Sequence, residues 1–167
     1  MNPPSLLIHL RDIILLPFSV IVIIPYFILE AGSDFQAEIT FRNILGLVLL
    51  GMGILLFFST VYLFKTIGRG TLAPWQPTQK LVISGPYRYC RNPMISAVLM
   101  ILLAETLLFA SWNLLIWAIM FFFINSVYFR LIEEPALLRR FGNEYLNYKQ
   151  NVPRWLARLK PFDPEQN

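Results

Sequence analysis

The sequence is poor in charged residues, in cysteine and in histidine. Only 14% of its 167 residues are charged, whereas a soluble domain carries about 25% and needs that charge to cover its surface. This shortage argues against a soluble globular protein, and a hydrophobic content of 56% argues against a disordered chain. A single cysteine, Cys90, excludes an intrachain disulfide. Because His9 is the single histidine, we expect no metal site built from such side chains.

The basic residues form no continuous basic face that nucleic acid would need. The formal net charge is +4, but lysines and arginines flank apolar runs, where they set membrane orientation and contact anionic headgroups. We therefore expect a membrane partner and no nucleic acid. The length fits one domain, residues 1–167.

Long apolar runs are what the sequence has in abundance. Because about 20 helical residues cross a bilayer, four runs predict membrane-spanning helices: Ile13–Leu29, Ile44–Phe64, Met94–Phe109 and Trp112–Phe129. The first contains Pro17 and Pro25, and we interpret it as a retained, kinked helix rather than a signal peptide. Only Ala110 and Ser111 separate the last two, which predicts a helical hairpin. We therefore predict an all-α integral membrane protein with four transmembrane helices.

Loop charge predicts the orientation of these spans. Residues 65–93 contain five basic and no acidic residues, and the tail after residue 129 contains seven basic residues. The positive-inside rule places both segments in the cytosol, together with both termini. The acidic segment 30–42 and the turn at 110–111 then face outward.

The hairpin also predicts where polar side chains meet. Residues equally far from the turn lie at similar depth, because both helices rise about 1.5 Å per residue. The predicted neighbours are Glu133 and Tyr89, Glu134 and Arg88, and Arg130 with Arg91 and Asn92. Acids, arginines and tyrosines thus converge at the cytosolic membrane boundary. One interpretation is that these charges simply pair with one another; the other is a ligand site.

Two prolines predict how the backbone runs beside this cluster. Asn92–Pro93 has the residue types of a helix N-cap and first turn, so the third span starts there with an anion-attracting end. Because the residue before a proline disfavours helical geometry, Pro135 predicts a bend or stop near Glu133 and Glu134.

The segment beyond Pro135 predicts an amphipathic helix at the cytosolic interface, weakened by Gly142. Its apolar stripe consists of Leu138, Phe141, Tyr145 and Tyr148. An anchor to the membrane and a lid over the cluster are equally compatible with this pattern. Residues 152–155 are expected to end the ordered chain, with Trp155 as an interface anchor.

These residues resemble the isoprenylcysteine carboxyl methyltransferase and phospholipid methyltransferase superfamily of membrane enzymes. The similar part covers about 65–161, after two N-terminal spans in residues 1–64. The resemblance is carried by Leu81-Val82, Gly85-x-Tyr87, Arg91-x-Pro93, Glu133-Glu134, Phe141-Gly142, Tyr145, Tyr148 and Val152-Pro153-Arg154.

The resemblance implies S-adenosylmethionine as methyl donor, bound on the cytosolic side. The implied donor-binding candidates, with Tyr145 and Tyr148 added to them, are Lys80, Leu81, Val82, Tyr87, Arg91, Asn92, Pro93, Met94, Glu133, Glu134, Tyr145 and Tyr148. Our candidate catalytic residues are Arg91, Asn92 and Glu133, and Glu134 is the preferred acid for the donor. Asn92 stands where the eukaryotic carboxyl methyltransferases have a histidine, and it cannot carry a proton. Arg130 is offset from their substrate-side arginine.

The residue chemistry agrees with methyl transfer, which needs alignment and desolvation rather than a metal or a protein nucleophile. We expect a lipid or apolar small-molecule acceptor that enters from the bilayer and is methylated on oxygen, nitrogen or sulfur. The alternatives are a non-catalytic membrane protein with a structural polar cluster and a relative of membrane reductases. The sequence does not determine the oligomeric state.

Overall fold

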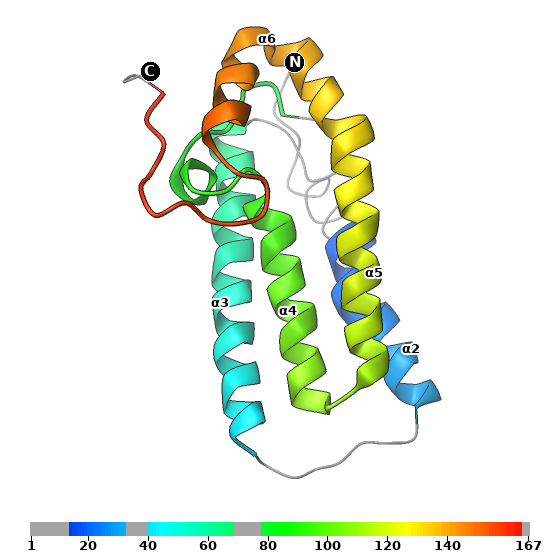
Figure 1. Ribbon diagram of the computed structural model, residues 1–167. Helices are drawn as coiled ribbons and strands as arrows, with labels where there is room; N and C mark the ends of the chain where they lie inside the picture. Colours follow the sequence, from blue (N-terminus) through cyan, green and yellow to red (C-terminus); the bar gives the residue numbers. More distant parts are fainter. Residues whose placement is uncertain (1–13, 33–39, 69–77, 165–167) are drawn as a thin grey trace.

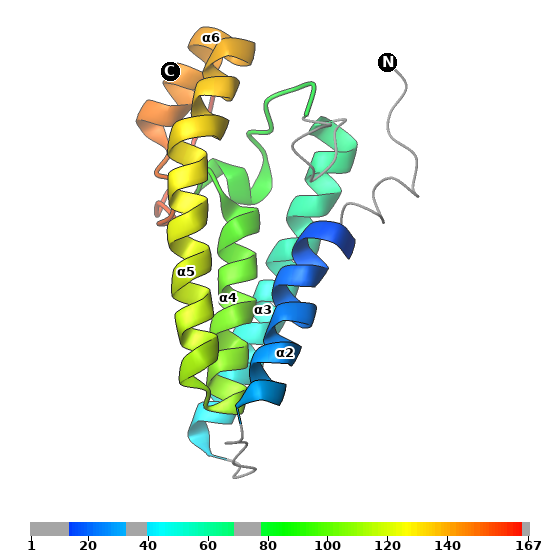
Figure 2. The same ribbon diagram turned by 90° about the vertical axis from the view of Figure 1, so that its right-hand side faces the viewer.

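The computed structural model describes residues 14–32, 40–68 and 78–164, and these residues contain helices and no strand. Figure 1 shows an elongated bundle whose long helices run side by side. The π-helical segment η1 (Ile14–Ile23) leads into α2 (Ile24–Ala31), and Figure 2 shows this pair along one side of the bundle. The predicted outward acidic segment falls largely on residues 33–39, outside the described residues.

The long helices begin and end close to the predicted span limits. The helix α3 (Phe41–Leu63) continues as the π-helical turn η2 (Phe64–Gly68), followed by α4 (Pro93–Phe109) and α5 (Trp112–Tyr128). Phe41–Gly68 and the helical stretch Trp112–Asn151 are long and apolar enough to cross a membrane. The all-helical prediction is therefore confirmed for the described residues.

Close contact between α3 and α4 forms the centre of the bundle. A Cβ atom added to Gly53 would lie 2.9 Å from Ile101 Cγ1 and 3.1 Å from the Ala97 carbonyl oxygen. Only glycine therefore lets the two helices approach this closely. The buried apolar core here consists of Phe57, Ala97, Val98, Leu102, Ala118 and Phe121.

The predicted hairpin between α4 and α5 is present. Ala110 ends α4 in the left-handed conformation with φ of 51°. Ser111 is the N-cap of α5, and its hydroxyl oxygen accepts a hydrogen bond from the Leu114 amide at 3.4 Å. The turn therefore needs no further residues.

Of the bend or stop predicted beside Pro135, the stop is wrong, and the backbone leaves regular α-helical geometry there only as a π-helical turn. The helix continues from α5 through the π-helical turn η4 (Phe129–Glu133) into α6 (Glu134–Asn151), and Glu133 and Glu134 both keep helical φ and ψ angles. Proline has no backbone N–H to donate, and the π-helical turn allows the helix to continue past it. The helical path is interrupted instead at Gly142, with φ of 53° and ψ of −127°.

The expectation that the ordered chain ends near Trp155 is also wrong. Residues up to 164 are described, and the tail runs back along the segment before α4. The amide of Phe162 donates to the Arg88 carbonyl at 2.9 Å, and the Arg158 amide donates to the Tyr89 carbonyl at 3.0 Å. Phe162 completes a second buried cluster with Tyr145, Tyr148 and Val152.

The short 3-10 helix η3 (Gly85–Arg88), α6 and the tail gather at one end of the bundle, opposite the Ala110 turn (Figure 1). The polar segments that the sequence singled out therefore meet at this end.

Candidate active site

A cavity of about 400 Å³ opens where these segments meet the long helices. Residues of η1, α3, α4, α5 and α6 contribute to its wall, together with the segment from Thr78 to Asn92. The lining carries polar side chains such as Arg91, Asn92 and Glu133, together with several tyrosines, and apolar side chains such as Val98. Such a mixed wall suits a ligand with one charged and one apolar part.

The segment before α4 places Arg91 and Asn92 at the cavity. Gly85 starts η3 with φ of +55°, a conformation that favours glycine. The Arg91 amide then donates to the Pro153 carbonyl at 2.9 Å, and its Nε donates to the Val152 carbonyl at 2.8 Å. The backbone of the tail thus fixes the main chain of Arg91 and the Nε of its side chain.

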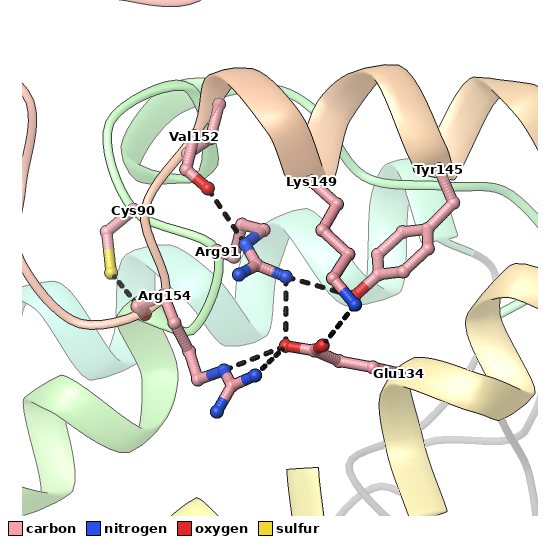
Figure 3. Close-up of polar contacts among 7 residues, drawn as sticks. All are labelled: Cys90, Arg91, Glu134, Tyr145, Lys149, Val152 and Arg154. Carbon is pink, nitrogen blue, oxygen red and sulfur yellow. Dashed lines mark hydrogen bonds and ion pairs between the residues drawn. The ribbon is translucent and has the colours of Figure 1, made fainter. Parts of the chain in front are cut away.

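Glu134 is held by three basic side chains (Figure 3). Its carboxylate lies 2.9 Å from Arg91 Nη1, 2.6 Å from Arg154 Nη2 and 2.8 Å from Lys149 Nζ. Burial by itself would raise the pKa of this carboxyl, but the bond to Lys149 and the charges of Arg91 and Arg154 outweigh it and lower the pKa. Glu134 is therefore ionised and already fully partnered.

Glu133, the preceding residue, has the opposite environment. It lines the cavity, and its Oε2 accepts a hydrogen bond from the Tyr128 hydroxyl at 3.4 Å. Burial raises its pKa despite that bond and the more distant charge of Arg140. Among the described residues no salt bridge reaches Glu133, so it is the acid with capacity for a cationic ligand.

Three tyrosines form the wall beside Arg91. Tyr148 donates to the Tyr87 carbonyl at 2.6 Å, and Arg91 Nη1 donates to the Tyr145 hydroxyl oxygen at 3.2 Å. Burial raises the pKa of all three, so they remain neutral. Their ring faces and hydroxyl groups are thus fixed features of the cavity.

Asn92 occupies the N-cap position of α4, as predicted, but its side chain does not cap the helix. Its Nδ2 is enclosed and has no hydrogen-bond partner within the described residues. Since Asn92 lines the cavity, this amide is a free donor for a ligand oxygen.

Most of the sequence candidates border this cavity. The lining includes Leu81, Val82, Tyr87, Arg91, Asn92, Met94, Glu133, Tyr145 and Tyr148. Lys80 is exposed and Pro93 is buried at the first turn of α4, and neither lines the cavity. Glu134 lies behind the wall in its ion-pair cluster, so the geometry favours Glu133 over Glu134 as a ligand residue.

The hairpin register differs from the prediction. Glu134 pairs with Arg91, three residues further along than the predicted Arg88, and Arg130 is exposed. Arg88 instead pairs with Asp163 at 3.7 Å and donates to the Phe162 carbonyl at 2.6 Å. The cause is local: η4 is π-helical, and residues before Pro93 lie outside α4, so neither arm keeps the α-helical rise there.

The sequence interpretation gave no role to Lys149 and did not predict that Arg154 contacts Glu134. Their basic character and position after an acidic pair were visible, but no local pattern indicates that the tail returns to Arg91. Among the described residues no three His, Cys, Asp or Glu side chains gather as a metal site would require.

One comparison with known proteins gives a match. The family model described as phospholipid methyltransferase matches residues 41–144, which include α3, α4, α5 and the cavity-lining segment. No curated protein matches, and no solved structure matches.

Proposed function

Because the chain belongs to the phospholipid methyltransferase family, we propose that this membrane methyltransferase uses S-adenosylmethionine and acts on a lipid or apolar small molecule. The observation that carries the proposal is the cavity, whose charged and apolar walls suit the two reactants.

The residues present fit the proposed donor, which supplies an activated methyl group on a sulfonium cation. Glu133, which has no buried basic partner, would hold the donor's cationic part. Arg91 and the free amide of Asn92 would hold its carboxylate. The neutral rings of Tyr145 and Tyr148 would cover the cation.

The apolar wall supports an apolar acceptor. Val20, Phe57, Val98 and Phe121 line the cavity from η1, α3, α4 and α5. These side chains would exclude water and align the acceptor with the methyl group, which are the contributions that an in-line displacement needs. The acceptor atom can be oxygen, nitrogen or sulfur.

We further propose four membrane spans, with the cavity and both termini in the cytosol. The shorter apolar helices Pro17–Ala31 and Pro93–Phe109 would complete the set begun by the two long ones. The positive-inside rule supports this orientation, since the basic segments gather at the cavity end (Figure 1).

The decisive experiment measures donor binding by purified protein in detergent, with Glu133→Gln as the test and Glu144→Gln as the control. Glu144 is exposed on α6. Loss of one charged hydrogen bond costs about 1.5 to 3 kcal/mol, so we expect roughly ten- to hundredfold weaker binding for Glu133→Gln. Equal affinity in both variants would remove Glu133 from the site. Wild-type protein that binds neither the donor nor its demethylated product would refute the proposal.

The acceptor is then found by transferring labelled methyl groups into a total lipid extract and identifying the labelled species. Incorporation into a lipid that Glu133→Gln reduces is the expected result.

A further inference from the structure

The segment Trp155–Lys160, here called the tail loop, exposes two leucines at the cavity end of the bundle. Leu156 is 80% exposed and Leu159 is 99% exposed. On either side of the loop, Val152 and Phe162 are almost completely buried. The exposed leucines therefore extend from a firmly anchored segment.

Backbone hydrogen bonds fix the position of this loop. The Arg158 amide, in the middle of the loop, donates to the Tyr89 carbonyl at 3.0 Å. Just before and after the loop, the Pro153 carbonyl and the Phe162 amide bond to Arg91 and Arg88. Because these partners immediately precede α4, the two leucines keep a fixed height relative to the helices.

Trp155 joins the loop to aromatic side chains at the end of α5 and the start of η4. Its ring lies 5.2 Å from the Phe122 ring and 6.1 Å from the Phe129 ring, between centroids. On the same stretch of α5, Phe123 and Val127 are more than half exposed, as lipid-facing side chains would be. The loop therefore lies at the depth where α5 leaves the apolar zone.

The loop is basic and contains no acid. The salt bridges that the structure gives involve Arg88, Arg91, Lys149 and Arg154 rather than Arg158 or Lys160, and the Arg158 guanidinium lies 6.0 Å over the Phe162 ring. Exposed leucines beside basic side chains complement a layer of lipid tails below anionic headgroups.

We propose that the tail loop inserts Leu156 and Leu159 into the leaflet at the cavity end, where Arg158 and Lys160 bind anionic phospholipid headgroups. This inference rests on the proposed membrane orientation and is independent of methyl transfer.

The test measures the depth of an environment-sensitive fluorophore on single cysteines in the full-length protein, reconstituted in vesicles. The background is Cys90→Ser, and the labelled variants are Leu159→Cys, Phe123→Cys as the lipid-facing reference and Glu144→Cys as the aqueous reference. Lipids brominated near the headgroup quench a probe that lies among them. We expect Leu159→Cys to be quenched at least threefold more than Glu144→Cys.

Charge dependence tests the second half of the proposal. Quenching at position 159 should increase when phosphatidylglycerol replaces part of the phosphatidylcholine, and Arg158→Gln combined with Lys160→Gln should abolish that increase. Quenching without this dependence would overturn headgroup binding.

The reference positions separate the possible failures. Quenching at Phe123→Cys but not at Leu159→Cys would overturn insertion of the loop, including the case in which a second copy covers it. Quenching at neither position would refute the membrane orientation and the insertion together.

Discussion

At the scale of single residues, two neighbouring glutamates have opposite electrostatic environments. Glu134 is enclosed by Arg91, Lys149 and Arg154, whereas Glu133 faces the cavity without a salt bridge in the described part of the chain. The sequence identified the pair and the expected convergence of charges. It could not assign the two roles, because these depend on which basic side chains the returning tail supplies.

Glu134→Gln should destabilise the protein. The change leaves three basic side chains around a neutral amide, and breaking a buried ion pair costs about 3 kcal/mol. Lys149 is 42% exposed and contributes less than the two arginines. Thermal unfolding in detergent should show a lower Tm for Glu134→Gln, while exposed Glu144→Gln stays near wild type. An unchanged Tm would contradict the structural role of this carboxylate.

The contributions of Glu133 and Glu134 to protein stability should depend on pH in opposite directions. The lowered pKa of Glu134 contributes stability that is present above the carboxyl group's unfolded pKa, about 4, and is lost as pH falls through the folded value. The raised pKa of Glu133 means that folding favours its protonated form, so its ionisation reduces stability as pH rises. Tm measured against pH should lose its acid-side decline in Glu134→Gln. Glu133→Gln should gain stability at neutral pH.

At the scale of elements, the long helices were predictable from the sequence and the connection between α5 and α6 was not. Apolar length predicts a membrane helix because lipid contact is a local property, and the Ala110–Ser111 turn marks the hairpin directly. Pro135 predicts a bend or stop, and the structure has a π-helical turn at Phe129–Glu133 followed by more helix. The real interruption is at Gly142, where the sequence showed only a weak helix former.

Gly142→Ala should destabilise α6 through the backbone alone. Gly142 has φ of +53°, which L-residues rarely adopt, and an added Cβ would meet nothing within 4 Å. We expect a loss of about 1 to 2 kcal/mol, seen as a lower Tm.

Gly51→Ala is the matched control, because Gly51 also has free space around its Cβ position but lies inside α3. Alanine should stabilise that helix by about 0.5 to 1 kcal/mol. Equal effects at both glycines would contradict a backbone origin.

At the scale of the whole molecule, the cavity joins segments that are far apart in sequence. Nine of the residues predicted from the sequence border it. They could be predicted because each family-like motif is recognisable by itself. The contacts of Phe162 and Arg154 were not predictable from local patterns. Phe162 bonds to Arg88, 74 residues earlier, and Arg154 bonds to Glu134, 20 residues earlier, and a returning tail leaves no periodic signal. The predicted pairing of Glu134 with Arg88 was wrong for a different reason, because the residues before Pro93 lie outside α4 and the α-helical rise does not apply to them.

The proposed orientation predicts opposite labelling at the two ends of the bundle. On a Cys90→Ser background, an impermeant thiol reagent added to intact cells should reach Asn113→Cys beside the hairpin turn. It should miss Glu144→Cys on α6 until the cells are permeabilised. Both positions are exposed, so labelling of both from outside would reject the four-span topology.

Because Cys90 lies beneath the tail, the reactivity of its thiol reports detachment of the tail. Cys90 is 5% exposed, its Sγ donates to the Arg154 carbonyl at 3.0 Å, and burial raises the pKa of its thiol. A reagent therefore reaches it only in molecules whose tail has lifted. When reclosing outpaces alkylation, the observed rate is the intrinsic thiol rate multiplied by the open fraction. The unmodified protein thus reports its own opening equilibrium, and the denaturant dependence of that rate distinguishes peeling of the tail from global unfolding.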